Sequence, residues 1–151
     1  MFLTAALAAG QIAPAYADGT TTMTSPYSHN YSNPCPPSTD AVIPVSGTLT
    51  IVMHSITTTN GAIRINELDI APSLTGTGLP SKDTYVVDQY DKFFFDVEPS
   101  GTEVDDIVDR FHVVSKGPSP NFTHTMQFHL TINPQGATTA TVYDLDDSCT
   151  G

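Results

Sequence analysis

One alternating segment holds two side chains of the kind that copper prefers. His124 and Met126 offer an imidazole and a thioether, and both groups suit copper. They are two positions apart, so they point the same way if the segment is a β-strand. However, the chain has no His-x-His pair, and neither His nor Met follows Cys149 as in a blue-copper site. Met126 also continues an apolar stripe, so core packing is its expected role and copper binding is the alternative.

Acidic side chains are concentrated in two parts of the sequence. Between Asp83 and Asp109 there are nine acids and one base, and a second group begins at Asp144. Calcium takes roughly six to eight oxygen ligands, which acidic loops can supply. Because no EF-hand loop of the D-x-D-x-D-G type is present, a solvated acidic face is the main expectation and calcium is the alternative. The candidate metal ligands are His124, Met126, Asp105, Asp106, Asp109, Asp144, Asp146 and Asp147.

No motif of a known catalytic site is present. The chain lacks G-x-S-x-G, a phosphate-binding loop, H-E-x-x-H and C-x-x-C. Paired carboxylates occur, but 16 acidic residues make such pairs expected by chance. We therefore expect a protein that is not an enzyme and has no cofactor, with calcium as the ion that its acids could bind. A glycan-active or metal-assisted hydrolase is the enzymatic alternative.

The chain has two cysteines, Cys35 and Cys149, and they bracket nearly all of the patterned sequence. In an exported protein, two thiols most simply form one disulfide. A metal-binding or catalytic cysteine is the alternative. Prolines flank Cys35 and Cys149 lies close to the printed C-terminus, so neither position is typical of a nucleophile. A Cys35–Cys149 disulfide is therefore predicted.

The first residues resemble the remnant of an export signal. Residues 1–17 carry no charge, and an Ala- and Leu-rich stretch leads to Ala15-Tyr16-Ala17. Small residues three positions and one position before the cleavage point, following an apolar segment, are typical of a signal-peptidase site. A basic segment is missing, since no Lys or Arg precedes Arg64, and a buried N-terminal helix is the alternative. The expected location is secreted, periplasmic or at the cell surface.

Overall composition limits the partners of this chain. It has 151 residues, a length typical of one domain, and 16 acidic against 5 basic residues give a net charge of −11. Such a chain cannot form a basic face for nucleic acid, and it is repelled by anionic membranes. No apolar run approaches the roughly 20 residues of a membrane-spanning helix, so no span is expected in the mature chain.

The sequence divides into a leader and a patterned region. Residues 19–39 contain no charged residue and are rich in Thr, Ser, Asn and Pro. They offer little surface to bury, so residues 18–41 are expected to form a flexible leader. From Val42 the chain becomes rich in Thr and Val, with turn dipeptides between short segments. These residues suit a half-buried pleated sheet, which predicts a β-domain over residues 42–149.

Alternation of apolar and polar residues predicts the individual strands. Asn60-Gly61 is typical of a type I′ hairpin turn, in which both residues have positive φ. Residues 103–114 also fit helical spacing, and a strand is favoured because β-branched residues are frequent. The expected strands are 44–59, 62–70 with a bulge at 66–67, a bent strand of 84–87 and 92–97, 103–114, 122–132 and 137–145, with a loop at 72–81.

About six to eight short strands without a long helix predict an all-β fold. A single antiparallel β-sandwich is favoured, and a small up-and-down β-barrel is the alternative. For function, we expect an exported β-sandwich that acts by binding or assembly at the cell surface or in the periplasm. Its partner would be a protein, a surface component or further copies of itself, with residues 19–39 adding to a neighbour's sheet. A carrier of small hydrophobic ligands is the alternative.

Overall fold

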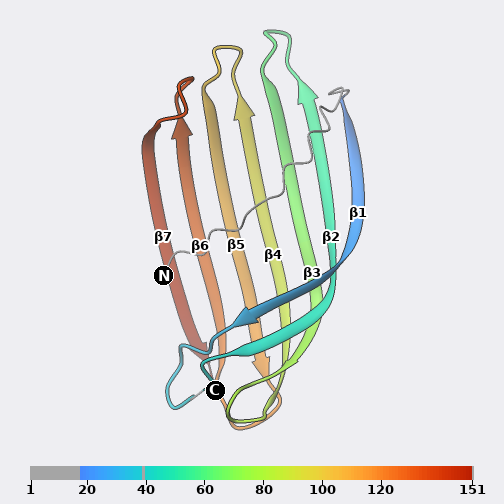
Figure 1. Ribbon diagram of the computed structural model, residues 1–151, viewed down its shortest axis with the longest axis vertical. Helices are drawn as coiled ribbons and strands as arrows, with labels where there is room; N and C mark the ends of the chain where they lie inside the picture. The colour runs from blue at the N-terminus through green and yellow to red at the C-terminus, as the bar shows by residue number, and fades with distance from the viewer. Residues whose placement is uncertain (1–17, 39, 151) are drawn as a thin grey trace.

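The computed structural model describes residues 18–38 and 40–150, and these form one antiparallel sheet (Figure 1). Each strand pairs with the next one in the chain, so the sheet order is the chain order. The all-β antiparallel prediction is confirmed. Among the described residues, no helix is long and apolar enough to cross a membrane. The strands are β1 (Gly19–Tyr31), β2 (Ile43–Thr57), β3 (Ile63–Thr77), β4 (Thr84–Val97), β5 (Glu103–Ser115), β6 (Asn121–Ile132) and β7 (Thr138–Thr150).

Three hairpin turns at one end of the sheet have the same construction. In each, the N–H of a positive-φ glycine donates to the carbonyl three residues earlier: Gly61 after β2, Gly101 after β4 and Gly136 after β6. Glycine has no Cβ, so it adopts this conformation without steric cost. The hairpin expected at Asn60-Gly61 is therefore confirmed. Its predicted type I′ geometry is wrong, because only the glycine of the pair has a positive φ.

The first two strands bend across one face of the sheet (Figure 1). The pairing of β2 with β3 shifts register between Ser46 and Thr50, and that of β3 with β4 shifts between Ala71 and Leu74. Such irregularities increase strand bend and twist. Gly76 allows the close approach, since a Cβ there would lie 2.1 Å from a backbone carbonyl oxygen of β2. We call the face that β1 crosses the inner face and the opposite one the outer face.

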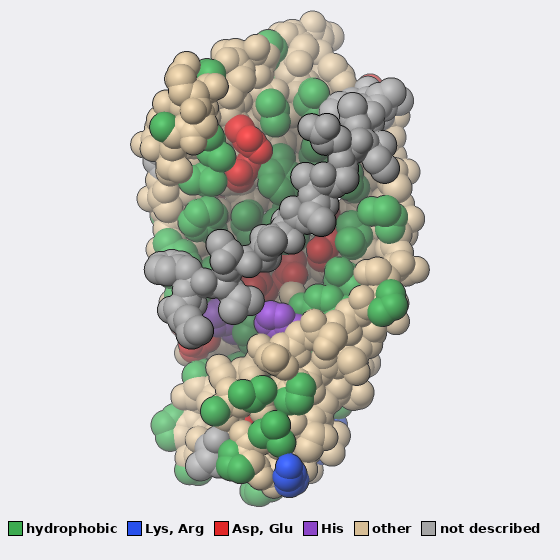
Figure 2. Space-filling model, in the orientation of Figure 1, with side chains coloured by type: hydrophobic (Ala, Val, Ile, Leu, Met, Phe, Trp, Pro, Cys, Tyr) green, Lys and Arg blue, Asp and Glu red, His purple; other side chains and the backbone are tan. Residues whose placement is uncertain are grey.

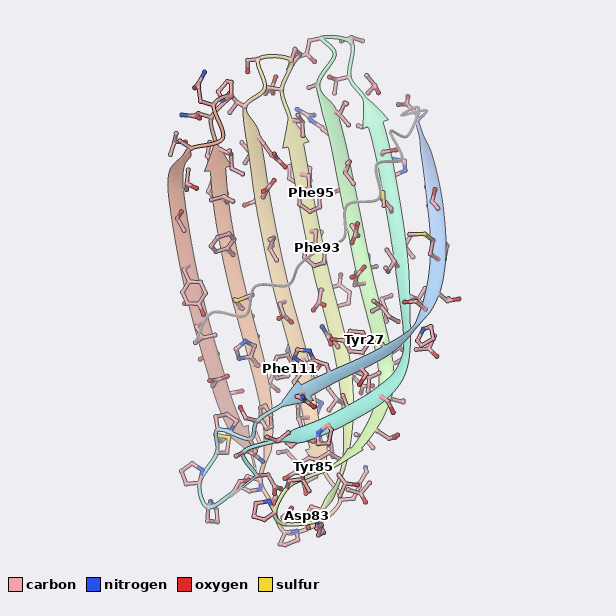
Figure 3. All side chains as sticks on the ribbon, viewed as in Figure 1. Tyr27, Asp83, Tyr85, Phe93, Phe95 and Phe111 are labelled. Carbon is pink, nitrogen blue, oxygen red and sulfur yellow. A yellow bond between two sulfur atoms is a disulfide. The ribbon has the colours of Figure 1, made fainter. Side chains whose placement is uncertain are left out.

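The core lies where β1 and β2 cover β4, β5 and β6. Tyr85 and Phe122 are the largest fully buried side chains, and Tyr85 lies beneath the bent part of β2 (Figure 3). Away from this overlap, the described residues form a single layer in the upper part of the sheet (Figure 1). The buried hydrophobic cluster consists of Tyr31, Cys35, Ile43, Val45, Leu49, Ala71, Leu74, Tyr85, Val87, Val113 and Phe122.

A buried acid connects the segment before β2 to the β3–β4 connection. Asp40 is 1% exposed, and its Oδ2 accepts hydrogen bonds from the hydroxyls of Ser81 at 2.5 Å and Tyr85 at 2.6 Å. Its Oδ1 accepts from the Ser81 N–H at 2.9 Å. Burial raises the pKa of Asp40, but these hydrogen bonds outweigh it and leave the pKa lowered. Asp40 is therefore a charged anchor of the fold.

The predicted disulfide is present. Cys35 and Cys149 are bonded, with a Cα–Cα distance of 5.7 Å, and the described residues contain no free cysteine. The bridge joins the β1–β2 connection to the end of β7, the strand at the other edge of the sheet. The export remnant proposed for residues 1–17 lies outside the described residues.

The main difference from the sequence analysis is an additional strand. Residues 19–31, expected to be a flexible leader, form β1 and pair with β2 along its length. The apolar pattern missed β1 because nearly all of its side chains are exposed and half of them are Thr or Ser, so no face had to be hydrophobic. Backbone hydrogen bonds to β2 and the few aromatic residues near Tyr31 hold the strand.

Other boundaries differ where both faces of a strand are partly buried. Residues 72–77 belong to β3 rather than to a loop, and the register is regular at 66–67, where a bulge was expected. The apolar side chains change from one face of the strand to the other at this point because acids occupy the inner-face positions.

The later strands also differ from the expected boundaries. β4 is continuous through Asp88 and Asp91 instead of being interrupted. The strand favoured for 103–114 is confirmed as β5, and the strands expected at 122–132 and 137–145 are β6 and β7.

Candidate functional site

Register places charged side chains unequally on the two faces of the sheet. Paired residues of neighbouring strands share a face, and faces alternate along each strand. The strands contain three basic residues, Arg64, Lys92 and Arg110, and all three fall on the outer face. The inner face of the described strands therefore has no Lys or Arg. The acids on that face are Glu67, Asp69, Asp91, Glu103, Asp105, Asp109 and Asp147.

Three of these acids form what we call the carboxylate row. Asp69 of β3 pairs with Asp91 of β4, which pairs with Asp109 of β5. Side chains that face each other across antiparallel strands have Cβ atoms roughly 4.5–5.5 Å apart, so the row is compact. Asp91 is only 7% exposed. Each of the three acids has a buried Oδ1 that no donor in the described part of the chain reaches, and the carboxyl groups of Asp91 and Asp109 lie close enough to share a hydrogen bond when one is protonated.

Strand β1 supplies the polar contacts at one side of the row. The Gln89 Oε1 accepts hydrogen bonds from the hydroxyls of Tyr27, at 2.8 Å, and Tyr31. Its Nε2 donates to Asp91 Oδ2 at 2.5 Å. With two donors on the amide oxygen, the amide nitrogen is turned toward Asp91. Figure 3 shows Tyr27 where β1 crosses the sheet, so the bend of β1 orients the middle acid of the row.

Four of the inner-face acids bind protons more tightly than free carboxyl groups do. Burial and the neighbouring Asp109 raise the pKa of Asp91 well above its usual range. Burial raises the pKa of Asp69, and burial together with the charge of Asp69 raises that of Glu67. Burial and a neighbouring acid raise the pKa of Asp105 to about 6. A cation that entered this face would compete with these protons.

Aromatic side chains continue the inner face above the carboxylate row. Phe93 and Phe95 of β4 stack with ring centroids 6.2 Å apart and planes inclined by 4° (Figure 3). In register, Phe93 pairs with Ile107 of β5, which pairs with Phe128 of β6. All four side chains are half-buried. Figure 2 shows acidic side chains among hydrophobic ones on this face.

This combination is suited to a ligand with positive charge and apolar surface. Carboxylates attract cations directly, and aromatic rings attract them through the electron density of their faces. No family model, curated protein or solved structure matches this chain. The chemistry of the site therefore rests on its own residues.

The two side chains proposed for copper lie on the inner face of β6, as their spacing predicted. His124 already has neighbours, since its Nδ1 lies 2.6 Å from Asp147 Oδ1 and its ring stacks on Phe111 at 4.5 Å. Met126 pairs with Asp109 and so extends the carboxylate row by one position. Copper binding by His124 and Met126 stays a prediction.

The six acids proposed as metal ligands are divided between the two faces. Asp105, Asp109 and Asp147 lie on the inner face, whereas Asp106 faces outward and has its Oδ1 2.6 Å from the Nδ1 of His129. Asp144 and Asp146 also face outward. In residues 18–38 and 40–150, no group of three His, Cys, Asp or Glu side chains is arranged to hold a metal ion. Calcium binding likewise stays a prediction.

Sequence reasoning missed the centre of the row. Asp91 lies in the gap between the two expected halves of a bent strand, and the expected metal ligands include neither Asp69 nor Gln89. One feature of the sequence pointed to Asp91. It lies two and four positions before Phe93 and Phe95, so in a strand it shares their face and interrupts a row of apolar side chains. This spacing cannot place Asp91 beside Asp69 or Asp109, because that depends on how β3, β4 and β5 pair.

Proposed function

We propose that this chain is an exported, non-enzymatic binding protein whose inner face takes a small organic cation with an apolar body. The observation that carries the proposal is Asp91, which is 7% exposed and has an Oδ1 without a partner in the described residues. Leaving a buried polar atom unpaired costs about 1–3 kcal/mol, and more if it is charged. A ligand that brings a positive group to this oxygen recovers that free energy.

The surroundings of Asp91 support a cation over a neutral or anionic ligand. Asp69 and Asp109 flank it, and the described inner face has no basic side chain. Phe93 and Phe95 offer apolar surface and ring faces next to the row. The net charge of −11 also increases the rate at which cations encounter the protein.

Ligand binding is better supported than the assembly alternative. In that alternative, residues 19–39 would add to the sheet of a neighbouring molecule. Residues 19–31 instead pair with β2 of their own chain and contact Gln89 through Tyr27 and Tyr31. The Cys35–Cys149 disulfide is compatible with an oxidising location, which supports a secreted, periplasmic or cell-surface protein.

Calorimetric titration with three six-carbon probes tests the proposal. Hexylammonium should bind, because its N–H groups can donate to the Asp91 carboxylate, whereas hexanol and hexyl sulfate should bind at least about tenfold more weakly, a difference of about 1.4 kcal/mol. Because the pKa of Asp91 is raised, binding near neutral pH should also release protons. Proton release is measured by repeating the titration in buffers with different heats of ionisation.

The variant Asp91→Asn keeps the shape of the side chain and removes its charge, and should weaken hexylammonium binding about tenfold or more. Asp144→Asn is the matched control, since this exposed acid lies on the outer face of β7 and should leave the affinity unchanged. Equal affinity for hexanol and the cation would show an apolar carrier instead. Unchanged binding by Asp91→Asn would contradict the assigned site.

A further inference from the structure

A hollow of about 630 Å³ lies on the outer face of the sheet, opposite the carboxylate row. Ligand pockets generally measure about 300–1,000 Å³, so the hollow is large enough for a small molecule. It spans two neighbouring register rows across four strands. Its floor and walls include Ile70, Tyr90 and Arg110 from one row, and Asp88, His112 and Thr123 from the next.

The bulge of β3 forms one wall of the hollow. Register is lost between Ala71 and Leu74, and Ser73 has a φ of 55°. The N–H of Ser73 donates to Asp88 Oδ1 at 2.7 Å, and Pro72 lines the hollow beside it. The irregular backbone thus orients the Asp88 carboxylate, whose other oxygen has no protein donor in the described part of the chain.

Tyr90 gives the hollow an accessible aromatic surface. Its side chain is 45% exposed, although it lies in the middle of β4 and pairs with Arg110 of β5. Arg110 makes no ion pair with the described residues. An exposed ring beside an unpaired guanidinium leaves both apolar contact area and hydrogen-bond donors available to a ligand.

The polar groups around Tyr90 are mixed and balanced in charge. Arg110 only donates hydrogen bonds, Asp88 only accepts them, and the Thr123 hydroxyl does both. The opposite charges of Asp88 and Arg110 leave little preference for either sign, and the His112 imidazole adds a further group that can bond hydroxyls. A ligand rich in hydroxyl groups matches this set, because each hydroxyl donates one hydrogen bond and accepts others.

We infer that the outer-face hollow binds a neutral sugar ring, with Tyr90 packed against the apolar C–H side of the ring. Asp88 and Arg110 bond its hydroxyls from opposite sides, and Thr123 adds a group that bonds in either direction. This site is independent of the inner face, because the two lie on opposite sides of the sheet.

Saturation-transfer NMR with a panel of methyl glycosides tests the inference. Glucose, galactose, mannose and N-acetylglucosamine derivatives are offered one at a time, and at least one should receive saturation on its ring C–H protons. Tyr90→Ala should remove most of this transfer. Tyr143→Ala, which removes an exposed tyrosine on the inner face of β7, should leave it unchanged.

Two further variants distinguish this site from the inner face and from an anion site. Asp91→Asn should bind the sugar normally even if it has lost the organic cation. Arg110→Gln should weaken sugar binding by several-fold, because one set of donors is lost. Benzoate serves as the anionic probe. The inference is overturned if no glycoside shows saturation transfer that depends on Tyr90. It is also overturned if benzoate is the only probe that binds and Arg110→Gln removes its binding.

Discussion

Asp40 and Asp91 are both buried acids, yet the protein treats their charges in opposite ways. Asp40 receives three hydrogen bonds from Ser81 and Tyr85, which stabilise its charged form. Asp91 receives one from Gln89 and faces Asp109, which destabilises its charged form. The first arrangement holds the fold together. The second arrangement favours the protonated carboxyl group of Asp91, on a face where a cationic ligand could replace the proton.

This difference predicts how stability depends on pH. The pKa values of Asp69, Asp91 and Asp105 are raised in the folded protein, and that of Asp105 is about 6. Their contribution to stability is therefore full below the unfolded value of about 4 and is lost as the pH rises through the folded values. Urea unfolding at about pH 5 and about pH 7.5 should show the larger free energy of unfolding at the lower pH.

The Asp91→Asn variant provides the control for this pH dependence. It removes one of the groups whose protonation stabilises the fold, so the difference in stability between the two pH values should decrease. The variant should also be at least as stable as the parent near neutral pH, because Asn is neutral without taking up the proton that folded Asp91 retains. A parent protein that is more stable at the higher pH would contradict the assignment of raised pKa values to this face.

Among the elements, those with one apolar face were predictable and those without were not. β6 alternates over its whole length, and its inner face holds Phe122, Met126 and Phe128. β1 has few apolar residues and is stabilised by pairing with β2, which leaves no local signal in its sequence. β3 and β4 carry half-buried side chains on both faces, so their patterns lose the period of two.

The candidate site was less predictable than the strands because it depends on register. The sequence pattern places Asp69 and Asp109 in expected strands and Asp91 in the gap between two expected strand halves, and it does not align the three acids. Their alignment requires that β3, β4 and β5 pair with no offset at this level, and a shift of one residue would send one acid to the outer face. Turn lengths and the bulge at 71–74 set that offset, and the bulge has no marker in the apolar pattern.

Gly76 is the element-level position most sensitive to substitution. In Gly76→Ala, the new Cβ would meet the Pro44 carbonyl oxygen at 2.1 Å and Val45 Cγ1 at 2.8 Å. Separating β2 from β3 here should lower the free energy of unfolding by about 1–3 kcal/mol or more. Gly136→Ala is the comparison, since its Cβ meets nothing within 4 Å and only its φ of 80° opposes the change. Urea unfolding should rank Gly76→Ala as the more destabilising; the reverse order would contradict the close approach.

For the molecule as a whole, the disulfide is a covalent link between the β1–β2 connection and β7, which the backbone joins only through the successive hairpins of the sheet. Closing a loop of 114 positions stabilises a fold by about 4–5 kcal/mol in the chain-entropy model, with strain reducing this value. Cys149→Ser should therefore lower the melting temperature by roughly 10–20 °C. Cys35→Ser should lower it by at least as much, because Cys35 is buried. Calorimetry measures both, and an unchanged melting temperature would show that the bridge carries little of the stability.

The same bridge determines how the protein responds to mechanical tension. If the chain is pulled from β1 and from the residue after Cys149, the force passes directly from Cys35 to Cys149, and the residues between them carry no load. Of the seven strands, only β1 lies outside this shielded loop, so it alone can be peeled away while β2 to β7 stay folded. Reduction of the bridge would release roughly 400 Å of hidden chain length. The oxidation state of this one disulfide thus sets how far the molecule can extend under tension.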